Sequence, residues 1–435
     1  MLSAQKHPAL TSLLDRLGIF PPFALGYLGL LVFMIGDGVE SGYLSPYLVG
    51  KGFSQSAVAV IFTVYGSTAA AASWFSGTLS DLWGSRRVMW IGLAIWTGFE
   101  LCFLLGGLPS VNWLAILATY ALRGFGYPLF AFGFLVWITA ATPQRRLGTA
   151  VGWFWFAFTG GLPTLGSLLA SYTVPVIGAY QTLWCSLGLV VLGGLIALLG
   201  MSEPIGARPL ARVDGHPIKT LLSGVTIGWK QPKILVGSIV RAINTAPQFG
   251  FLVFLPIFFT QTIGFSLTQW LRILSLMFLS NIVWNLLFGI IGDRFGWRRT
   301  VAVCGGMGSA ITTLVLYYVP KTFGANYLLA IAAAVMYGAT LAGYVPLSAL
   351  MPSLAPQNKG AAMSMLNLGA GASVWFGPAI VALFLAPLGV AGVMWIFALL
   401  YVVSAILTLF LTLPSEARGD RITAEVMKGE QAAAR

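Results

Sequence analysis

Residues 77–87 read Gly77-Thr-Leu-Ser-Asp81-Leu-Trp-Gly84-Ser-Arg86-Arg87, and residues 289–299 read Gly289-Ile-Ile-Gly-Asp293-Arg-Phe-Gly296-Trp-Arg298-Arg299. The two stretches share Gly, Asp, Gly and two Arg in one register, at an offset of 289 − 77 = 212 residues. At the same offset, Gly148-Thr-Ala-Val pairs with Gly360-Ala-Ala-Met. Self-similarity at a fixed offset is the sequence signature of a repeated structural unit. The sequence therefore predicts two copies of one unit.

The composition places both copies in a membrane. The 435 residues are 58% hydrophobic and only 8% charged, with a mean hydropathy of +0.87. Soluble domains carry about 25% charged residues, so this chain could not keep a soluble surface hydrated. The net charge of +12 is spread over short loops between apolar runs and forms no single patch. That distribution predicts membrane topology and argues against nucleic-acid binding.

Twelve apolar stretches are each long enough to cross a bilayer, which takes about 20 residues. We predict membrane helices at 24–48, 57–80, 88–107, 112–138, 147–170, 180–201, 234–260, 268–292, 300–319, 326–351, 359–384 and 390–413. The predicted fold is an all-α membrane protein of two pseudo-symmetric six-helix bundles. The predicted domains are a bundle over 1–201, a linker over 202–233, a bundle over 234–413 and a tail over 414–435.

Lysine and arginine predict the orientation. Under this helix map, the terminal tails, the central linker and the loops on the same side carry all but five of the 24. The five are Lys51, Lys321, Arg123, Arg241 and Arg272. Positive charge gathers on the cytoplasmic side of membrane proteins. We therefore expect both termini and the linker in the cytoplasm, and the basic, bacterial-looking chain suggests the inner membrane.

The loop over 77–87 resembles the signature between helices two and three of the major facilitator superfamily, and its second copy lies where that family often repeats it. The resemblance covers the whole chain and implies a secondary transporter. In that family such loops latch the inner gate. This implies a gating role for Asp81, Arg86, Arg87, Asp293, Arg298 and Arg299.

A closer resemblance is to the bacterial ribitol and D-arabinitol permeases. It rests on five stretches: Gly36-Asp-Gly-Val-Glu40, Gly152-Trp-Phe-Trp155, Val240-Arg-Ala-Ile-Asn-Thr245, Asn358-Lys-Gly-Ala-Ala362 and Asn367-Leu-Gly-Ala-Gly371. Members of that branch are taken to import sugar alcohols with protons. The implied substrate is a polyol such as ribitol, D-arabinitol or D-sorbitol, carried by alternating access.

Charged residues inside membrane helices are costly and mark functional sites. Asp37 and Glu40 are three apart on one face of the first helix, so they repel and at least one should hold a proton near neutral pH. Arg123 in the fourth helix is the expected counter-ion. In proton–sugar symporters of the superfamily an acid in helix one pairs with an arginine in helix four, which implies the pair Asp37–Arg123. Glu40 is the second choice for the proton, and a purely structural ion pair is the alternative. We expect Glu100 to be structural or at the lipid interface.

Polar and aromatic side chains at helical spacing predict the substrate site. Hydroxyl groups need amide and carboxylate partners, and aromatic faces suit the carbon chain. Each amide could instead bond neighbouring helices, and each tryptophan could serve packing. The candidates are Arg241, Asn244, Gln248, Asn281, Asn285, Asn367, Trp375, Trp153 and Trp155.

Other functions are disfavoured. Both histidines, His7 and His216, fall outside the predicted helices, and the three cysteines form no cluster, so neither a catalytic centre nor a metal site is expected. We expect no enzyme activity and no cofactor apart from the coupling proton. The expected partners are a small polyol and the lipid bilayer, with no nucleic acid, and the protein is expected to be a monomer. The alternatives are a carrier for an organic acid or another small solute, and an uncoupled polyol facilitator.

Overall fold

The computed structural model describes residues 19–143, 146–201, 203–209, 230–355 and 359–413, and every regular element in these ranges is helical. In the first half, the helices are α2 (Ala24–Gly38) with η2 (Val39–Gly42) and α3 (Leu44–Gly50), α4 (Gln55–Trp83), α5 (Ser85–Cys102) with η3 (Phe103–Gly107) and α6 (Leu108–Ser110), α7 (Trp113–Arg123) with α8 (Gly126–Ala141), α9 (Leu147–Thr159) with η5 (Gly160–Leu165) and α10 (Gly166–Ile177), and α11 (Ala179–Gly200).

The second half follows the same order. Its helices are α13 (Pro232–Ile257) with η7 (Phe258–Ile263), α14 (Leu267–Phe295), α15 (Trp297–Thr300) with η8 (Val301–Met307) and α16 (Gly308–Phe323), α17 (Tyr327–Leu341) with η9 (Ala342–Tyr344) and α18 (Leu347–Leu354), and α19 (Lys359–Leu409). Two further 3₁₀ turns, η1 (Pro21–Phe23) and η6 (Ile205–Ala207), flank the first bundle.

These helices make the twelve predicted crossings. Ten stretches of the described chain are long and apolar enough to span a membrane. One of them, Ala362–Leu409, has 48 residues, about twice what one crossing needs. Gly389 within it has a φ of 66°, which ends one helix and begins the next. The segment from α9 to α10, interrupted by a π-helical turn around Pro163, supplies the remaining crossing.

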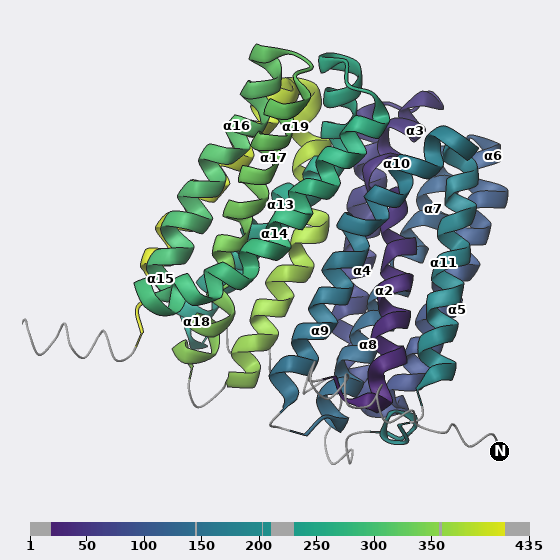
Figure 1. The fold of residues 1–435 in the computed structure, drawn as a ribbon, viewed down its shortest axis with the longest axis vertical. Coiled ribbons are helices and arrows are strands. Elements are labelled where there is room, and N and C mark those ends of the chain that lie inside the picture. The colour runs from purple at the N-terminus through teal and green to yellow at the C-terminus, as the bar shows by residue number, and fades with distance from the viewer. Residues whose placement is uncertain (1–18, 144–145, 202, 210–229, 356–358, 414–435) are drawn as a thin grey trace, which may run out of the picture.

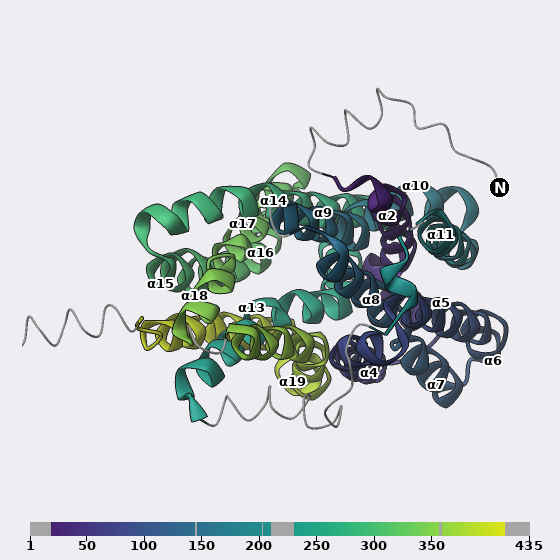
Figure 2. The ribbon, with the colours of Figure 1, turned by 90° about the horizontal axis from the view of Figure 1, so that it is seen from below.

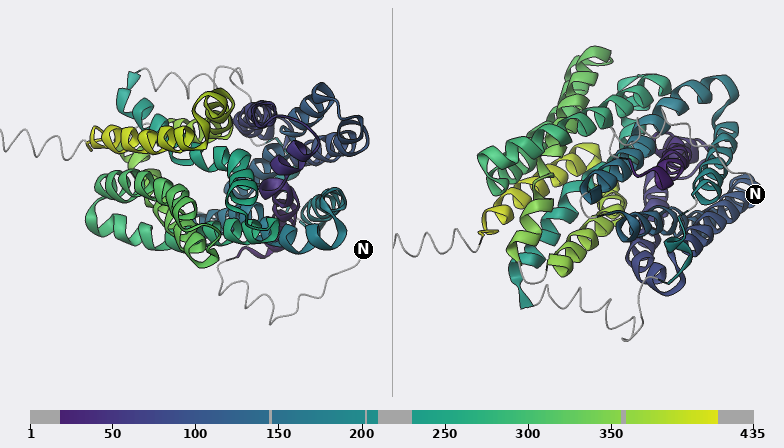
Figure 3. Two further views of the ribbon diagram at one scale, coloured as in Figure 1. Left: turned by 90° about the horizontal axis from the view of Figure 1, so that it is seen from above. Right: turned by 60° about the horizontal axis from the view of Figure 1, so that its bottom comes forward.

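The crossings form two bundles, as predicted. Figure 1 shows the first half, coloured purple to teal, beside the second half, coloured green to yellow. The view from below in Figure 2 and the two views in Figure 3 show the same division. The domain limits proposed from the sequence stay predictions, because residue 202, residues 210–229 and residues 414–435 lie outside the described residues.

Hydrogen bonds join the two bundles near one end. The Trp270 indole donates to the carbonyl of Gly42 at 2.9 Å, and the Ser275 hydroxyl donates to the carbonyl of Thr164 at 2.8 Å. The Ser45 hydroxyl also donates to the carbonyl of Val253. Gly42 and Ser45 belong to the α3 end of the first bundle, which lies opposite the described N-terminal end in Figure 1. These bonds fasten the bundles together at the α3 end.

Two helices of the first bundle are broken where charged residues lie. The first crossing tightens into the 3₁₀ turn η2, which contains Glu40. The fourth crossing turns at Gly124, directly after Arg123 ends α7. Irregular backbone at membrane depth is tolerated only where it is buried in protein or lines a cavity. Both breaks therefore indicate a functional region in the interior of the first bundle.

Candidate functional site

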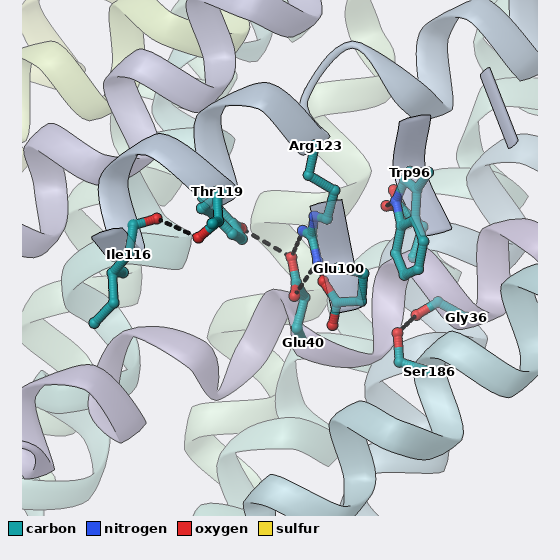
Figure 4. A network of polar contacts seen from close by, with 10 residues as sticks. Gly36, Glu40, Trp96, Glu100, Ile116, Thr119, Arg123 and Ser186 are labelled. Carbon is teal, nitrogen blue, oxygen red and sulfur yellow. Dashed lines mark hydrogen bonds and ion pairs between the residues drawn. The ribbon is translucent and has the colours of Figure 1, made fainter. Parts of the chain in front are cut away.

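The centre of the first bundle holds a buried ion cluster around Arg123. This side chain is 0% exposed, and its Nη1 lies 2.8 Å from Glu40 Oε2 and 2.6 Å from Glu100 Oε2. Its Nη2 bonds Glu40 Oε1, which also accepts from the Tyr120 hydroxyl at 2.8 Å. Figure 4 shows the two glutamates pointing at the guanidinium from different helices. The cluster joins the first, third and fourth crossings.

The predicted contact between Asp37 and Arg123 was wrong. Asp37 Oδ1 accepts a hydrogen bond from the Trp96 indole at 2.6 Å, and the described ion pairs of Arg123 are with Glu40 and Glu100. The Trp96 ring covers the guanidinium at 5.0 Å from its centroid, so it occupies the side of Arg123 that faces α5. Gly126 permits this arrangement, because a Cβ there would lie 2.4 Å from Trp96 Cβ.

Of the two roles expected for Glu100, the place at the lipid interface was wrong, because its side chain is 0% exposed and bonds Arg123. A signal in the sequence could have found it. Trp96 and Glu100 are four residues apart and so share one face of α5. A tryptophan and an acid on one helix face suit a buried cation, since the ring faces it and the carboxylate bonds it.

The cluster carries more acid than base. Among its described members Arg123 is the one cation, and Asp37, Glu40 and Glu100 are three buried acids around it, none more than 5% exposed. The rings of Tyr120 and Tyr65 lie 4.5 Å and 5.4 Å from the guanidinium carbon and add to its stabilisation. Uncompensated charge in a water-poor interior is strongly unfavourable, so such a group of acids is suited to binding a proton.

A cavity of about 60 Å³ lies between the bundles beside this cluster. Polar groups come from the first bundle, and the second bundle contributes apolar side chains. Of the described residues that line it, none is basic. Its walls are Asp37, Glu40, Ser41, Phe62, Tyr65, Tyr120, Tyr127, Leu162, Phe249, Leu252, Val374 and Pro378. A water needs roughly 15 Å³ of such volume, so the cavity has room for a few waters and must widen to take a larger solute.

The seventh crossing carries a second, half-buried arginine in a different setting. Arg241 Nη1 donates to Asn244 Oδ1, and neither described ion pair includes Arg241. Asn244 is 2% exposed, and its backbone carbonyl accepts a hydrogen bond from the Tyr401 hydroxyl at 3.0 Å. Gln248 is half-buried and precedes Phe249, which lines the cavity. The predicted polar face of helix seven therefore leads to the cavity, although Arg241, Asn244 and Gln248 do not line it.

The remaining predicted substrate residues also lie outside the cavity wall. Asn281 donates to the carbonyl of Gly338 at 3.2 Å, and Asn285 donates to Asn281 at 3.3 Å, so in this structure both amides bond within or between helices. The others are half-buried or exposed side chains, namely Trp153, Trp155, Asn367 and Trp375. Their roles in substrate binding stay predictions.

The twin loops have matching backbones. Gly84 and Gly296 have φ values of 86° and 91°, a region that favours glycine. Arg86 donates to the carbonyl of Leu198 at 2.8 Å, and Arg298 donates to that of Leu409 at 3.5 Å. Each arginine thus ties its loop to the last helix of its own bundle.

The other predicted gating residues of the two loops are an aspartate and a second arginine in each. Asp293 accepts from the Trp297 indole at 2.8 Å, and Asp81 is half-buried. Arg87 and Arg299 are exposed. The gating role of all six loop residues stays a prediction.

Sequence comparison decides the family. The profile described as Major Facilitator Superfamily matches residues 26–284 and 237–432. The chain belongs to the major facilitator superfamily. It is therefore a multi-pass membrane transporter and not an enzyme, as the twin loops and the composition predicted. The helix order and the two bundles described above are the fold of this superfamily.

Curated relatives cover nearly the whole chain. The Alpha-ketoglutarate permease of Bacillus subtilis (strain 168) is 47% identical over 95% of this chain and 94% of its own length. The D-arabinitol transporter of Klebsiella pneumoniae is 37% identical over 89% of this chain and 91% of its own. The Ribitol transporter of the same organism is 36% identical, with coverages of 87% and 89%. The predicted resemblance to the polyol permeases is confirmed.

Solved structures share the fold at low sequence identity. The crystal structure of a D-xylose-proton symporter aligns with a TM-score of 0.67 at 17% identity, covering 88% of this chain and 95% of that one. The crystal structure of a mutant of the nucleoside transporter NupG aligns with a TM-score of 0.69 at 16% identity, covering 89% and 99%. At these identities the likeness shows the fold alone.

Proposed function

We propose that this protein imports a sugar alcohol by proton symport across the inner membrane, working by alternating access as a monomer with both termini in the cytoplasm. The observation that carries the proposal is the chemistry of the inter-bundle cavity. Two acidic residues and three tyrosines line it, and none of its described wall residues is basic. A neutral solute rich in hydroxyl groups matches such walls, whereas a carboxylate would face Asp37 and Glu40 with no basic residue among the described wall residues, and the nearby Arg123 already bonds Glu40 and Glu100.

Asp37 has one described donor, the Trp96 indole, so substrate hydroxyls can supply further donors to its carboxylate. Hydrogen bonds to a charged acceptor are stronger than neutral ones, so Asp37 and Glu40 can hold a polyol once the cavity widens. The rings of Phe62, Tyr65 and Tyr127 provide apolar faces for the carbon chain. In this proposal Gln248, Asn244 and Arg241 extend the site along helix seven. A site built to bond hydroxyls rejects analogues that lack them, because its buried polar groups would be left unpaired.

The excess of acid over base provides the proton site. Glu40 and Glu100 together bond Arg123, while Asp37 borders the cavity and has only the Trp96 indole as a described partner. We assign the coupling proton to Asp37, with Glu40 as second choice, and treat Glu100 as a positioning residue that holds Arg123. A proton taken up on Asp37 outside and released inside would bias the carrier between its two open states.

A specific observation supports a second candidate, import of an organic acid. The B. subtilis relative at 47% identity carries the name Alpha-ketoglutarate permease. Arg241 is half-buried beside Asn244 and belongs to neither described ion pair, so it could receive a carboxylate. Under this alternative the site would centre on helix seven, away from Asp37.

Uptake into proteoliposomes separates the candidates. Labelled ribitol, with D-arabinitol and D-sorbitol as comparisons, is presented with and without an acidic exterior, and unlabelled α-ketoglutarate or succinate is added as competitor. Accumulation of a polyol only under the proton gradient, unaffected by the acids, is the expected result. Uptake that merely equilibrates would indicate a facilitator. Accumulation of α-ketoglutarate with no polyol uptake would establish the second candidate and overturn the first.

A further inference from the structure

A second cavity lies beside the loop that joins helices eight and nine. It has a volume of about 310 Å³ and lies between the end of α14, α15 and α18. Figure 1 shows these elements at the end of the second bundle that is remote from the joined α3 end. The described residues around it are Gly292, Asp293, Phe295, Gly296, Trp297, Arg298, Arg299, Leu350 and Leu413. It includes three of the predicted gating residues and lies apart from the proposed substrate and proton sites.

The matching place in the first bundle is filled by the chain that follows its last helix. The Glu203 carboxylate accepts from the Trp137 indole at 2.6 Å and from the backbone N–H of Ile205 at 2.9 Å. Gly206 packs so closely on Trp137 that a Cβ there would lie 2.0 Å from the ring. A Cβ on Gly84 would lie 3.0 Å from the carbonyl oxygen of Gly206. Residues 203–206 therefore form a strap over the first loop.

The second loop has the same backbone but no such cover among the described residues. Gly296 has nearly the φ of Gly84, yet no described atom outside its own neighbours lies within 4 Å of a Cβ built on it. The residue that matches Trp137 at the repeat offset of 212 is Ala349, which is much smaller. The small side chain and the open space at Gly296 account for the cavity.

The sequence contains a counterpart of the strap. Ser202-Glu203-Pro204-Ile205-Gly206 follows α11, and Ser415-Glu416-Ala417-Arg418-Gly419 follows α19. Serine, glutamate and glycine match at 415 − 202 = 213, one residue from the offset of the repeat. Leu413, at the end of the described chain, already lines the cavity. The tail therefore begins at the cavity wall.

We propose that residues 415–419 of the chain's own tail dock in this cavity, as residues 203–206 do on the first loop. Glu416 has no indole at the position of Trp137, so its carboxylate pairs with the guanidinium groups of Arg298 and Arg299 on the cavity wall. Arg–carboxylate pairing is strong and geometrically specific. The docked tail ties the end of helix twelve to the second loop, giving the two bundles equivalent straps. The inference does not depend on which solute is carried.

Disulfide formation in the full-length protein tests the docking. Cys102, Cys185 and Cys304 are first replaced by serine, and Phe295→Cys on the cavity wall is combined with Ser415→Cys. We expect Glu416→Arg to slow oxidation of this pair about threefold, and Arg299→Glu added to Glu416→Arg to restore the rate. If neither charge change alters the oxidation rate, the short chain between Leu413 and residue 415 alone brings the cysteines together. That result would overturn the proposal.

Two further measurements keep the test decisive. Vesicles with and without phosphatidylglycerol are compared, because an anionic headgroup is the other ligand that a basic cavity could hold. Slower oxidation in phosphatidylglycerol that is independent of Glu416 would assign the cavity to lipid and contradict tail docking. In the protein with its native cysteines, Glu416→Gln should speed tryptic removal of the tail about threefold. Unchanged cleavage would count against the proposal.

Discussion

Each bundle carries an arginine within a membrane helix, buried in the first bundle and half-buried in the second, and the two surround it differently. Arg123 in the first bundle bonds two glutamates and lies against three aromatic rings. Arg241 in the second bundle bonds Asn244 and takes part in neither described ion pair. The repeat that makes the bundles alike in fold does not extend to their charges. Under the proposed function the first bundle binds the proton and the substrate hydroxyls, and the second keeps a cation that no described acid neutralises.

Substitution of Arg123 should have the largest effect. Arg123→Ala leaves Glu40 and Glu100 buried without their cation, and breaking a buried ion pair costs about 3–5 kcal/mol. We expect gradient-driven uptake to vanish and the midpoint of thermal unfolding in detergent to fall. Arg241→Ala is the matched control and should change the unfolding midpoint much less. Equal destabilisation by the two variants would remove the distinction between the two arginines.

Substitution of Asp37 should separate coupling from transport. In Asp37→Asn the amide oxygen can still accept from the Trp96 indole, so the local structure should persist. We expect polyol exchange between two solutions at equal pH to stay within about threefold of the wild type, because only one hydrogen-bonding group is altered. Accumulation against a gradient should be lost. Undiminished accumulation would contradict the assignment of the proton to Asp37.

The bond between Trp96 and Asp37 should have an intermediate effect. Trp96→Phe keeps a ring over Arg123 but removes the donor to Asp37. A hydrogen bond to a charged group contributes about 1.5–3 kcal/mol, so proton-driven uptake should fall about tenfold. Initial rates measured across external pH would check this. If the pH profile and rate matched the wild type, Trp96 would be a packing residue only.

The smallest effect on polyol transport is expected from Arg241. Arg241→Gln keeps a donor on helix seven while removing the charge. Ribitol uptake should fall only about threefold, because at most one hydrogen bond to an uncharged substrate is lost. The same variant tested with α-ketoglutarate sharpens the comparison. The organic-acid alternative would be favoured by two results together. The unsubstituted protein would take up α-ketoglutarate but not ribitol, and Arg241→Gln would lose the α-ketoglutarate uptake.

The sequence predicted the fold almost completely. The length of the apolar stretches indicates the membrane crossings, and the 212-residue repeat indicates the two bundles. The predicted crossings match within about four residues, including the break near Gly389, except that the fifth continues to Ile177. The internal breaks at Glu40 and after Arg123 were missed. Both lie in glycine-rich stretches, Gly36–Gly42 and Gly124–Gly126, whose spacing could have indicated departures from a regular helix.

The candidate site was predicted less completely. Helical spacing placed Asp37 and Glu40 on one face, and charge complementarity together with the family resemblance added Arg123. Neither could say which acid bonds the guanidinium. That choice depends on the 3₁₀ turn at Glu40 and on the close approach of Gly126 to Trp96, which brings the indole against Asp37. The sequence left Glu100 between a structural role and the lipid interface, because its partner Arg123 lies on another helix. Contacts between helices decide such roles, and periodicity along one helix does not report them.

Proton movement on addition of substrate tests the central claim most directly. Proteoliposomes at equal internal and external pH receive unlabelled ribitol or α-ketoglutarate while external pH is recorded, with Asp37→Asn as the control. The account predicts alkalinisation on addition of ribitol to the wild type, none with Asp37→Asn, and none with α-ketoglutarate. Ribitol that enters without moving protons, or alkalinisation with α-ketoglutarate alone, would contradict it.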